Sequence, residues 1–276
     1  MKQTDALSQR LQDRSAVLVS VERTQGSAPR EAGAWMAVFA DAVLGSVGGG
    51  QLEYQAIDRA RDLLVSGQAP AVLRYPLGPS LGQCCGGVMH LRFERITQAD
   101  SESLAQRLRV APMPVVLFGG GHVGRALARL LADLPCELAW IDSRDGIFPA
   151  LPAGNVLCEH SDPVQAAVRD LRVVRAGSHV LIMSFSHAED LDILAECLRR
   201  QRDHADLASI GLIGSKSKWA SFRHRLEARG FTEQEMAWVT SPIGLPGVHG
   251  KEPEVIALAV AAQLMQRRRP AAASGQ

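Results

Sequence analysis

The chain has 276 residues, of which 46% are hydrophobic, and it carries a formal net charge of +1 at pH 7. That length can bury one large or two modest hydrophobic cores, and the near-neutral charge offers no broad basic or acidic face. Neither a nucleic acid nor an anionic membrane is therefore expected as a partner. No stretch has the apolar core of a signal peptide or the length of a transmembrane span, so we expect a cytoplasmic protein.

The cysteines give no sign of a disulfide framework. There are five of them, an odd number, and no C-x-x-C spacing is repeated along the chain. This pattern disfavours both a secreted disulfide scaffold and a cysteine-rich structural zinc site. We expect free thiols.

The first part of the chain, residues 1–108, is predicted to form a smaller α+β domain. Glycine-rich loops separate short runs of Val, Leu and aromatic residues, which favour β-strands. The predicted strands are residues 16–21, 34–39, 71–75 and 88–93. Apolar residues at helical spacing predict an amphipathic helix over residues 51–65.

A loop over residues 24–30 joins the first two predicted strands and contains Ser27 and Arg30 among turn-forming residues. Backbone N–H groups exposed by such a turn, together with a guanidinium fork, can bind a phosphate. An ordinary hairpin with an exposed arginine is the simpler explanation of the same residues.

Three consecutive glycines, Gly48, Gly49 and Gly50, precede the predicted helix. Their open N–H groups and missing side chains would let a ligand approach the main chain, although a flexible turn is the alternative. Glu53 follows in the first helical turn, where a carboxylate favours the helix dipole. Because glycines weaken helices and strands, we expect a geometric demand here, and the close approach of a ligand is one such demand.

Cys84 and Cys85 lie between Gly82 and Gly86 and carry the most distinctive chemistry of the chain. Adjacent cysteines are poor disulfide partners, because neighbouring side chains of extended backbone point in opposite directions. On a glycine-rich loop, N–H groups can lower the pKa of a thiol, and the thiolate can ligate a metal or carry sulfur. The alternative is one cysteine buried as a small hydrophobic residue while the other is incidental.

The second part of the chain, residues 109–276, alternates short apolar runs with helical stretches. This pattern predicts an α/β, Rossmann-like domain with a doubly wound parallel sheet. The predicted strands are residues 115–118, 137–141, 155–158, 179–184 and 209–213, and the predicted helices are residues 122–132, 163–170, 188–200, 216–229 and 253–266.

A glycine motif supports this fold. Gly119, Gly121 and Gly124 match G-x-G-x-x-G directly after a predicted strand and before a predicted helix. In such loops the first glycine makes a tight turn, the second admits a phosphate, and the third lets helix and strand pack closely. His122, inside the loop, would donate to the anion or cap the helix in solvent.

Asp142 ends the next predicted strand, where dinucleotide-binding folds place an acidic residue that binds a ribose hydroxyl. Ser143 and Arg144 follow it and suit a 2′-phosphate, so both NAD and NADP remain open. A Rossmann scaffold that keeps its glycines only for helix packing, or that binds another phosphate, is an equal alternative.

Polar residues also follow two later strands. His187, Asp190 and Asp192 could bind a divalent cation, although carboxylates at a helix start are ordinary partners of the helix dipole. The segment 211–218 would cover a phosphate or cap a helix.

In order along nearly the whole chain, these motifs resemble the XdhC/CoxI xanthine dehydrogenase accessory proteins. The resemblance rests on residues 26–30, 48–53, 81–87, 119–124, 141–144, 211–216 and 241–245 and on the segment around His187. It implies a chaperone that binds the molybdenum cofactor (molybdopterin) and holds it while a cysteine desulfurase installs a sulfido ligand. Such a chaperone delivers the cofactor to xanthine dehydrogenase or a related molybdenum hydroxylase and needs no catalytic turnover of its own.

The resemblance also implies roles for the candidate residues. Arg30, with Ser27 and the three glycines Gly48, Gly49 and Gly50, would hold the pterin phosphate, and Cys84 or Cys85 would approach the molybdenum. The ligand of the Rossmann-like domain is left open by the sequence; its own motif, and not the resemblance, makes a nucleotide or NAD(P) a candidate, bound through Gly119, Gly121, His122, Gly124 and Asp142. A homo-oligomer of the empty carrier is also expected.

Two other functions fit parts of the sequence. An NAD(P)-dependent oxidoreductase would use Gly119 to Gly124 and Asp142 but would leave Cys84 and Cys85 without a task. A scaffold protein that steadies the dehydrogenase explains neither glycine loop.

Overall fold

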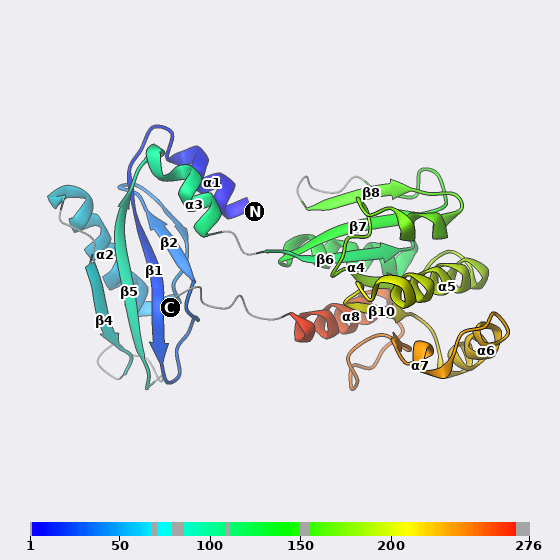
Figure 1. The fold of residues 1–276 in the computed structure, drawn as a ribbon. Helices are drawn as coiled ribbons and strands as arrows, with labels where there is room; N and C mark the ends of the chain where they lie inside the picture. Colours follow the sequence, from blue (N-terminus) through cyan, green and yellow to red (C-terminus); the bar gives the residue numbers. More distant parts are fainter. Residues whose placement is uncertain (1, 68–70, 79–85, 109–110, 150–154, 269–276) are drawn as a thin grey trace. The chain divides into compact units, whose positions relative to one another are not determined.

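The computed structural model describes residues 2–67, 71–78, 86–108, 111–149 and 155–268. These residues form two compact units, residues 2–108 and residues 111–268, and each is described by itself. Figure 1 labels their helices and strands. Cys84 and Cys85 lie outside the described residues.

The N-terminal unit is built on a five-stranded antiparallel sheet with the strand order β3-β2-β1-β5-β4. Its strands are β1 (Ala16–Gln25), β2 (Trp35–Val38), β3 (Val43–Gly45), β4 (Ala71–Pro76) and β5 (Val88–Ile96). Its α-helices are α1 (Lys2–Arg10), α2 (Gly50–Ser66) and α3 (Ser101–Arg107).

Alternation along β1 divides the core of this unit between the two faces of the sheet. Val17, Val19 and Val21 are buried in one cluster with the apolar side chains of α2. Ala16 and Leu18 belong to a second cluster that includes residues of α1 and α3. Because side chains of a strand point alternately to opposite faces, β1 holds helices on both sides of the sheet. The predicted α+β class is confirmed.

The C-terminal unit is built on a six-stranded parallel sheet with the strand order β11-β10-β9-β6-β7-β8. Its strands are β6 (Met113–Phe118), β7 (Cys136–Asp142), β8 (Val156–His160), β9 (His179–Ile182), β10 (Ser209–Leu212) and β11 (Val239–Thr240). Numbered from β6, this is the order 3-2-1-4-5-6 of a doubly wound Rossmann sheet. The predicted fold class is therefore confirmed for this part of the chain.

Helices cover both faces of the parallel sheet. Helices α4 (His122–Asp133) and α8 (Pro253–Arg267) share one apolar cluster with the sheet. The other face is covered by α5 (His187–His204), α6 (Lys216–Glu227), α7 (Glu233–Met236) and the 3-10 helix η3 (Val164–Arg169). The expected α-helix over residues 163–170 is thus a 3-10 helix instead.

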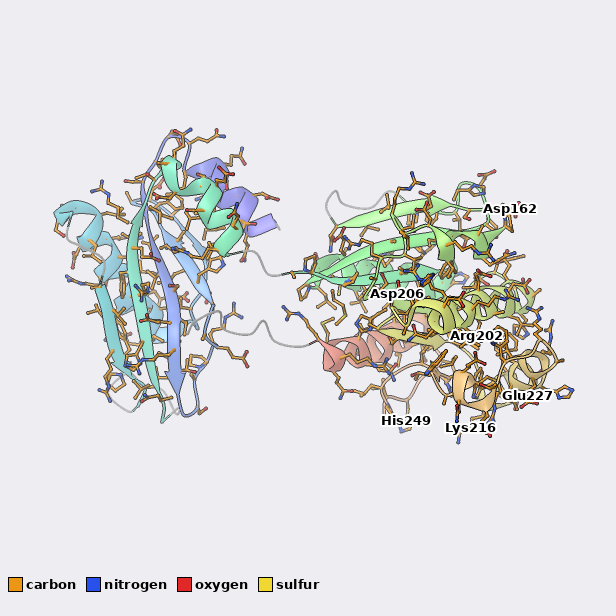
Figure 2. The ribbon with its side chains drawn as sticks, viewed as in Figure 1. Asp162, Arg202, Asp206, Lys216, Glu227 and His249 are labelled. Atoms are coloured by element: carbon orange, nitrogen blue, oxygen red, sulfur yellow. The ribbon has the colours of Figure 1, made fainter. Side chains whose placement is uncertain are left out.

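Charged side chains lie on the outside of the C-terminal unit. Lys216, Glu227 and His249 are exposed and are labelled in Figure 2. Within the residues that the structure describes, no helix is both long and apolar enough to cross a lipid bilayer.

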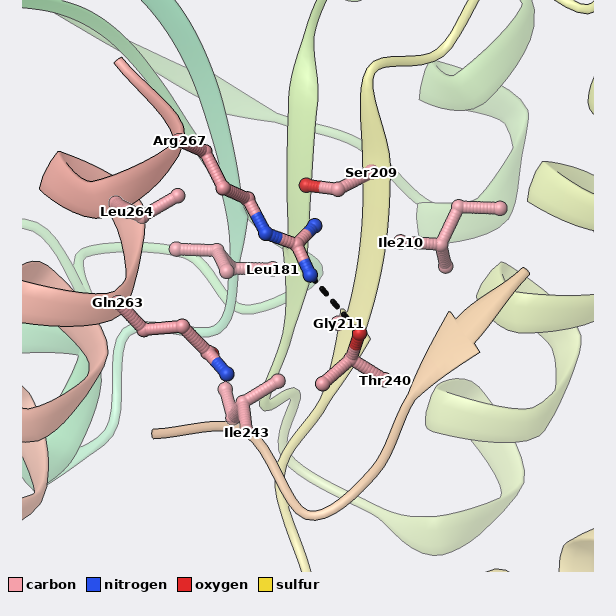
Figure 3. A pocket seen from close by; sticks show the side chains of 9 residues that line it. All are labelled: Leu181, Ser209, Ile210, Gly211, Thr240, Ile243, Gln263, Leu264 and Arg267. Carbon is pink, nitrogen blue, oxygen red and sulfur yellow. Dashed lines mark hydrogen bonds between the residues drawn. The ribbon is translucent and has the colours of Figure 1, made fainter. Parts of the chain in front are cut away.

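A small pocket lies between α8 and the strands β9 and β10 (Figure 3). Arg267 of α8 reaches across it and donates a hydrogen bond of 3.2 Å to Thr240 Oγ1. Leu181, Ile243 and Leu264 supply apolar lining. Of the described residues that the sequence singled out for ligand binding, Gly211 at the start of the segment 211–218 lines this pocket, whereas the N-terminal loops, the Rossmann glycines and Asp142 do not.

Candidate functional site

Three loops that the sequence singled out meet at one end of the N-terminal sheet. A Cβ atom on Gly87, which follows β4 and precedes β5, would lie 2.2 Å from the carbonyl oxygen of Ser27. A Cβ atom on Gly48 would lie 2.6 Å from Cγ of Pro29 and 3.6 Å from Cγ of Arg30. The glycine backbones of the second and third loops therefore pack directly against the loop that follows β1.

The glycine turn before α2 needs glycine at all three positions. Gly48, Gly49 and Gly50 have φ angles of 140°, 75° and 62°. Residues with a Cβ rarely adopt these left-handed conformations without strain. The sequence predicted that three consecutive glycines are needed for the backbone geometry, and the three positive φ angles are that geometry.

Glu53 fixes this turn from the first turn of α2. Its Oε2 accepts hydrogen bonds from Ser46 Oγ at 2.6 Å, from the Val47 N–H at 3.0 Å and from the Gly49 N–H at 3.1 Å. Burial alone would raise the pKa of Glu53, but the hydrogen bonds from Ser46 and these amides outweigh it and lower the pKa. The sequence suggested only a helix-dipole partner here, so the anchoring role of Glu53 was missed.

These hydrogen bonds change which amides are available to a ligand. The Gly48 N–H donates to Ser46 Oγ at 3.2 Å, and the Gly49 N–H donates to Glu53. Gly50 is the first residue of α2, where an N–H has no acceptor within the helix. Of the three predicted phosphate donors, Gly50 is thus the one whose amide is not used inside the turn in the described structure.

Ser27 and Arg30 lie on the exposed side of the same loop cluster. Within the described parts of the chain, the Arg30 guanidinium forms no ion pair. Cys84 and Cys85 are outside the described residues, but Gly86 and Gly87, which follow them, are described, and Gly87 lies against Ser27. The structure therefore brings Ser27, Arg30 and the glycine turn together at the point where the cysteine motif ends.

A row of basic side chains crosses the same sheet close to these loops. Arg23 of β1 is paired with His90 of β5, which is paired in turn with Arg74 of β4. Paired residues share a face of the sheet, and a register shift between Val21 and Arg23 turns Arg23 away from the α2 face.

His90 is the buried member of this row. It is only 8% exposed, whereas Arg23 and Arg74 are exposed. Nδ1 of His90 is buried and has no hydrogen-bond partner among the described residues. A buried polar atom without a partner is costly, so it is a candidate contact for a bound group. Alternation along residues 88–93 could have indicated that His90 and Arg92 face away from α2, but the bulge in β1 has no mark in the sequence.

The glycines of the Rossmann loop have two different tasks. A Cβ atom on Gly119 would lie 2.0 Å from the Met183 carbonyl oxygen, and one on Gly124 would lie 2.0 Å from the Gly119 carbonyl oxygen. Both positions therefore exclude any side chain for reasons of packing. A Cβ atom on Gly121 would meet nothing within 4 Å, and Gly121 and His122 are exposed at the start of α4. Gly121 is the open position at which a phosphate could approach.

Asp142 is buried at the end of β7, and its carboxylate is fully occupied. Oδ1 accepts from the Arg144 N–H and Nε, both at 2.9 Å. Oδ2 accepts from the Gly120 N–H at 2.6 Å and from Arg144 Nη2 at 2.9 Å. Burial alone would raise the pKa of Asp142, but these hydrogen bonds outweigh it and lower the pKa. A ribose hydroxyl could reach this carboxylate only if Arg144 moved.

Arg144 lies beside the exposed ring of Phe185, with its guanidinium carbon 4.7 Å from the ring centroid. Ser143 donates a hydrogen bond of 2.6 Å to Glu189 in the first turn of α5. Arg125 of α4 donates to the Gly120 carbonyl oxygen at 3.1 Å and so fixes the glycine loop from the helix side.

Asp190 belongs to a buried ion pair at the carboxyl ends of β9 and β10. Its Oδ1 accepts from the Ser184 N–H and from Ser184 Oγ, both at 2.8 Å. Its Oδ2 accepts from Lys218 Nζ at 2.6 Å. Ser215 Oγ accepts from the Lys218 N–H at 3.1 Å and caps α6. The segment 211–218 therefore caps a helix and supplies a lysine that ties two strand ends together.

His187 and Asp192 do not join Asp190. The His187 ring is exposed and packs edge-on against Phe222, and Asp192 forms an ion pair of 2.7 Å with Arg229. Across the part of the chain that the structure describes, no three His, Cys, Asp or Glu residues are placed to hold a metal ion.

Comparisons with known proteins give the same picture of both units. The sequence model of the XdhC Rossmann domain matches residues 115–264, and that of the XdhC and CoxI family matches residues 10–76. The uncharacterized protein YqeB of Escherichia coli (strain K12) is 28% identical over 270 residues, which are 95% of this chain and 45% of that protein. The chain thus spans less than half the length of this curated relative.

A solved structure is similar in fold to this chain. It is described as the crystal structure of a xanthine dehydrogenase from Bacillus halodurans and has a TM-score of 0.76 at 20% sequence identity. The match covers 99% of this chain and 98% of the other. At this identity the likeness shows the fold. Since the XdhC Rossmann model alone matches more than half of the residues, in the order and fold described above, the chain belongs to the XdhC and CoxI family.

Proposed function

We propose that this protein binds the molybdenum cofactor as cargo at the N-terminal loop cluster and delivers it to xanthine dehydrogenase or a related molybdenum hydroxylase. The observation that carries this proposal is the convergence of three loops. Gly87, at the end of the cysteine motif, packs on Ser27, and Gly48 packs on Pro29 beside Arg30. Groups that are separated in the sequence therefore face one region.

The side chains around this cluster suit an anionic, phosphate-bearing cargo. Arg30 is exposed and can offer a bidentate fork to a phosphate. The Gly50 N–H at the start of α2 adds a donor, and the adjacent basic row adds positive charge and a buried imidazole nitrogen. The molybdopterin cofactor combines such a phosphate with a soft metal–sulfur centre. Thiolates are suitable ligands for that centre.

Cys84 and Cys85 are assigned to the metal end of the cargo. In this proposal one of the two thiolates contacts molybdenum, or the sulfur that is being transferred, while a cysteine desulfurase sulfurates the bound cofactor. The assignment is supported by their adjacency in the sequence to Gly86 and Gly87, because Gly87 packs against Ser27. The protein itself acts as a carrier and needs no turnover.

The recipient is assigned from the family and from a related structure. Membership of the XdhC and CoxI family supports a role in the maturation of xanthine dehydrogenase. A solved structure of the same fold that is described as a xanthine dehydrogenase is in line with this assignment.

Metal and pterin analysis of the purified protein tests the proposal. We expect molybdenum, measured by mass spectrometry, and pterin, measured by fluorescence after oxidation, to copurify with the wild-type chain. Both should fall at least about tenfold in the double variant Cys84→Ser with Cys85→Ser. Cys158→Ser is the matched control, because Cys158 is exposed in β8 of the other unit.

The rival function, an NAD(P)-dependent oxidoreductase, predicts a different result. It requires turnover with a nicotinamide cofactor and no uptake of pterin at any protein concentration. Turnover without pterin uptake would refute the proposed chaperone function.

A further inference from the structure

The carboxyl end of the parallel sheet carries the features of a nucleotide site. The strand order reverses between β6 and β9, and ligands of doubly wound sheets bind at this switch point. Gly121 is open there, and Arg125 holds the glycine loop. Such a site can bind either a ribose with a free diol or a ribose that carries a phosphate, and the side chains at the end of β7 decide between the two.

Nucleotide folds that recognise a free ribose diol use a carboxylate at the end of the second strand of the sheet. Asp142 stands at that position, at the end of β7, but it is 2% exposed and accepts four hydrogen bonds from Gly120 and Arg144. A carboxylate has about four acceptor positions. The Asp142 carboxylate, which would bind a diol, therefore has its acceptor positions occupied by Gly120 and Arg144.

Arg144 is the group that this arrangement presents instead. Nε and Nη2 are fixed by Asp142, and Nη1 donates to none of the described residues. One third of the side chain is exposed, at 33%. The guanidinium also lies against the ring of Phe185, which is 65% exposed. Because Asp142 fixes the orientation of Arg144, its Nη1 group can donate hydrogen bonds to a phosphate. The exposed ring of Phe185 can stack on a base.

From this geometry we propose that the Rossmann unit binds a nucleotide with a phosphate on its ribose, of the NADP(H) type, in preference to one with a free diol, of the NAD(H) type. Arg144 recognises the ribose phosphate, and Asp142 positions Arg144. This inference concerns the second unit and does not depend on the cargo of the first.

Other charged groups near Arg144 also affect the binding of a phosphate. Glu189 accepts a hydrogen bond from Ser143 and lies close enough to raise the pKa of Arg144, after the larger contribution of Asp142. Asp145, on the loop that carries Arg144, lies 3.4 Å from Nε2 of His160 at the end of β8, and both side chains are exposed. Because the Glu189 carboxylate repels a phosphate, its neutral replacement should strengthen binding of a phosphorylated ribose and leave that of a free diol unchanged.

Titration of the purified 276-residue chain tests this inference. NADPH and NADH are followed by nicotinamide fluorescence, and 2′,5′-ADP and 5′-AMP by calorimetry. We expect each 2′-phosphorylated ligand to bind about tenfold or more tightly than its partner, as for one charge-assisted pair. Arg144→Gln should abolish the preference, whereas Arg129→Gln, at an exposed position of α4, should keep it. Glu189→Gln should tighten NADPH binding alone.

Three results would overturn the proposal. These are equal affinities within each pair, no binding of NADPH or 2′,5′-ADP at millimolar concentration, and loss of NADH binding in Glu189→Gln, which would make Glu189 the diol acceptor. The comparison of ligands on the wild-type chain needs no variant, so it holds even if Arg144→Gln does not fold. Pterin content in the same preparations tests the cargo proposal separately.

Discussion

A hydrogen bond of 2.6 Å joins Ser46 Oγ to Oε2 of Glu53, across the glycine turn that precedes α2. The same carboxylate oxygen accepts the N–H groups of Val47 and Gly49. A turn with three left-handed glycines has little conformational preference of its own, so this carboxylate is what holds it in one shape. The shape of the glycine turn beside Arg30 therefore depends on a side chain of α2.

Replacing this carboxylate should loosen the turn without unfolding the protein. Glu53→Gln keeps the size of the side chain but removes the charge-assisted acceptor, which should cost about 1–3 kcal/mol locally. Hydrogen–deuterium exchange should become faster at the Val47 and Gly49 amides, and pterin content should fall. Glu102→Gln, at an exposed site in α3, is the control. Unchanged exchange in Glu53→Gln would show that the glycine turn is held by other contacts.

The effect of Glu53 should also depend on pH in a defined direction. The pKa of Glu53 is lowered in the folded chain. A carboxyl group with a lowered pKa stabilises the fold fully above its unfolded pKa, about 4.3, and loses that contribution as the pH falls through the folded value. The difference in exchange between wild type and Glu53→Gln should therefore persist at pH 7 and shrink below about pH 4. A difference that grew on acidification would contradict this account.

The contact between Gly87 and Ser27 can be tested with two neighbouring glycines. A Cβ atom on Gly87 would lie 2.2 Å from a backbone oxygen, whereas one on Gly86 would meet no atom of the described residues within 4 Å. Gly87→Ala should destabilise the N-terminal unit by about 1–3 kcal/mol, because backbone atoms must separate. It should also lower pterin content, and Gly86→Ala should do neither. Urea unfolding and pterin analysis measure the two effects, and equal behaviour of the two variants would argue against a shared loop cluster.

The Rossmann unit could be predicted from sequence because its signals are long or specific. The helices α4, α5, α6 and α8 span several turns each, and Gly119, Gly121 and Gly124 lie directly between a strand and a helix or in its first turn. The strand β11 has two residues, too few to produce a periodic pattern, and it was missed. The strand β3, with three residues, was missed for the same reason.

The candidate sites were less predictable, since they depend on where side chains point. The sequence placed Asp142 and Arg144 together but could not decide whether the carboxylate faces a ribose or the arginine. The row Arg23, His90 and Arg74 depends on a bulge in β1, and a bulge changes which side chains share a face. The anchoring role of Glu53 depends on its hydrogen bonds to Ser46, Val47 and Gly49, which the spacing of these residues in the sequence does not reveal.

Substitutions of two glycines in the Rossmann loop should distinguish a role in packing from a role in ligand binding. Gly124→Ala brings a Cβ atom to 2.0 Å from the Gly119 carbonyl oxygen and should destabilise the C-terminal unit by about 1–3 kcal/mol. Gly121→Ala adds a methyl group in open space and should leave stability unchanged. If a phosphate approaches at Gly121, the same variant should weaken NADPH binding. Full binding by a stable Gly121→Ala protein would mean that the loop keeps its glycines for packing alone.

Cysteine reactivity should single out the cysteine motif. Burial raises the pKa of Cys136 to about 11 and raises that of the fully buried Cys197 further. Partial burial also raises the pKa of Cys158. Because thiolates are the species that iodoacetamide alkylates, these three thiols should react slowly at pH 7.5.

In the proposed function, Cys84 or Cys85 is a thiolate, so at least one of them should be alkylated about tenfold faster, which follows if its pKa is at least one unit lower. Peptide mass spectrometry over a time course measures all five positions. The chain unfolded in urea is the control, in which the five rates should converge. Labelling of Cys158 at the same rate as Cys84 and Cys85 in the folded chain would remove the chemical argument for a special role of the motif.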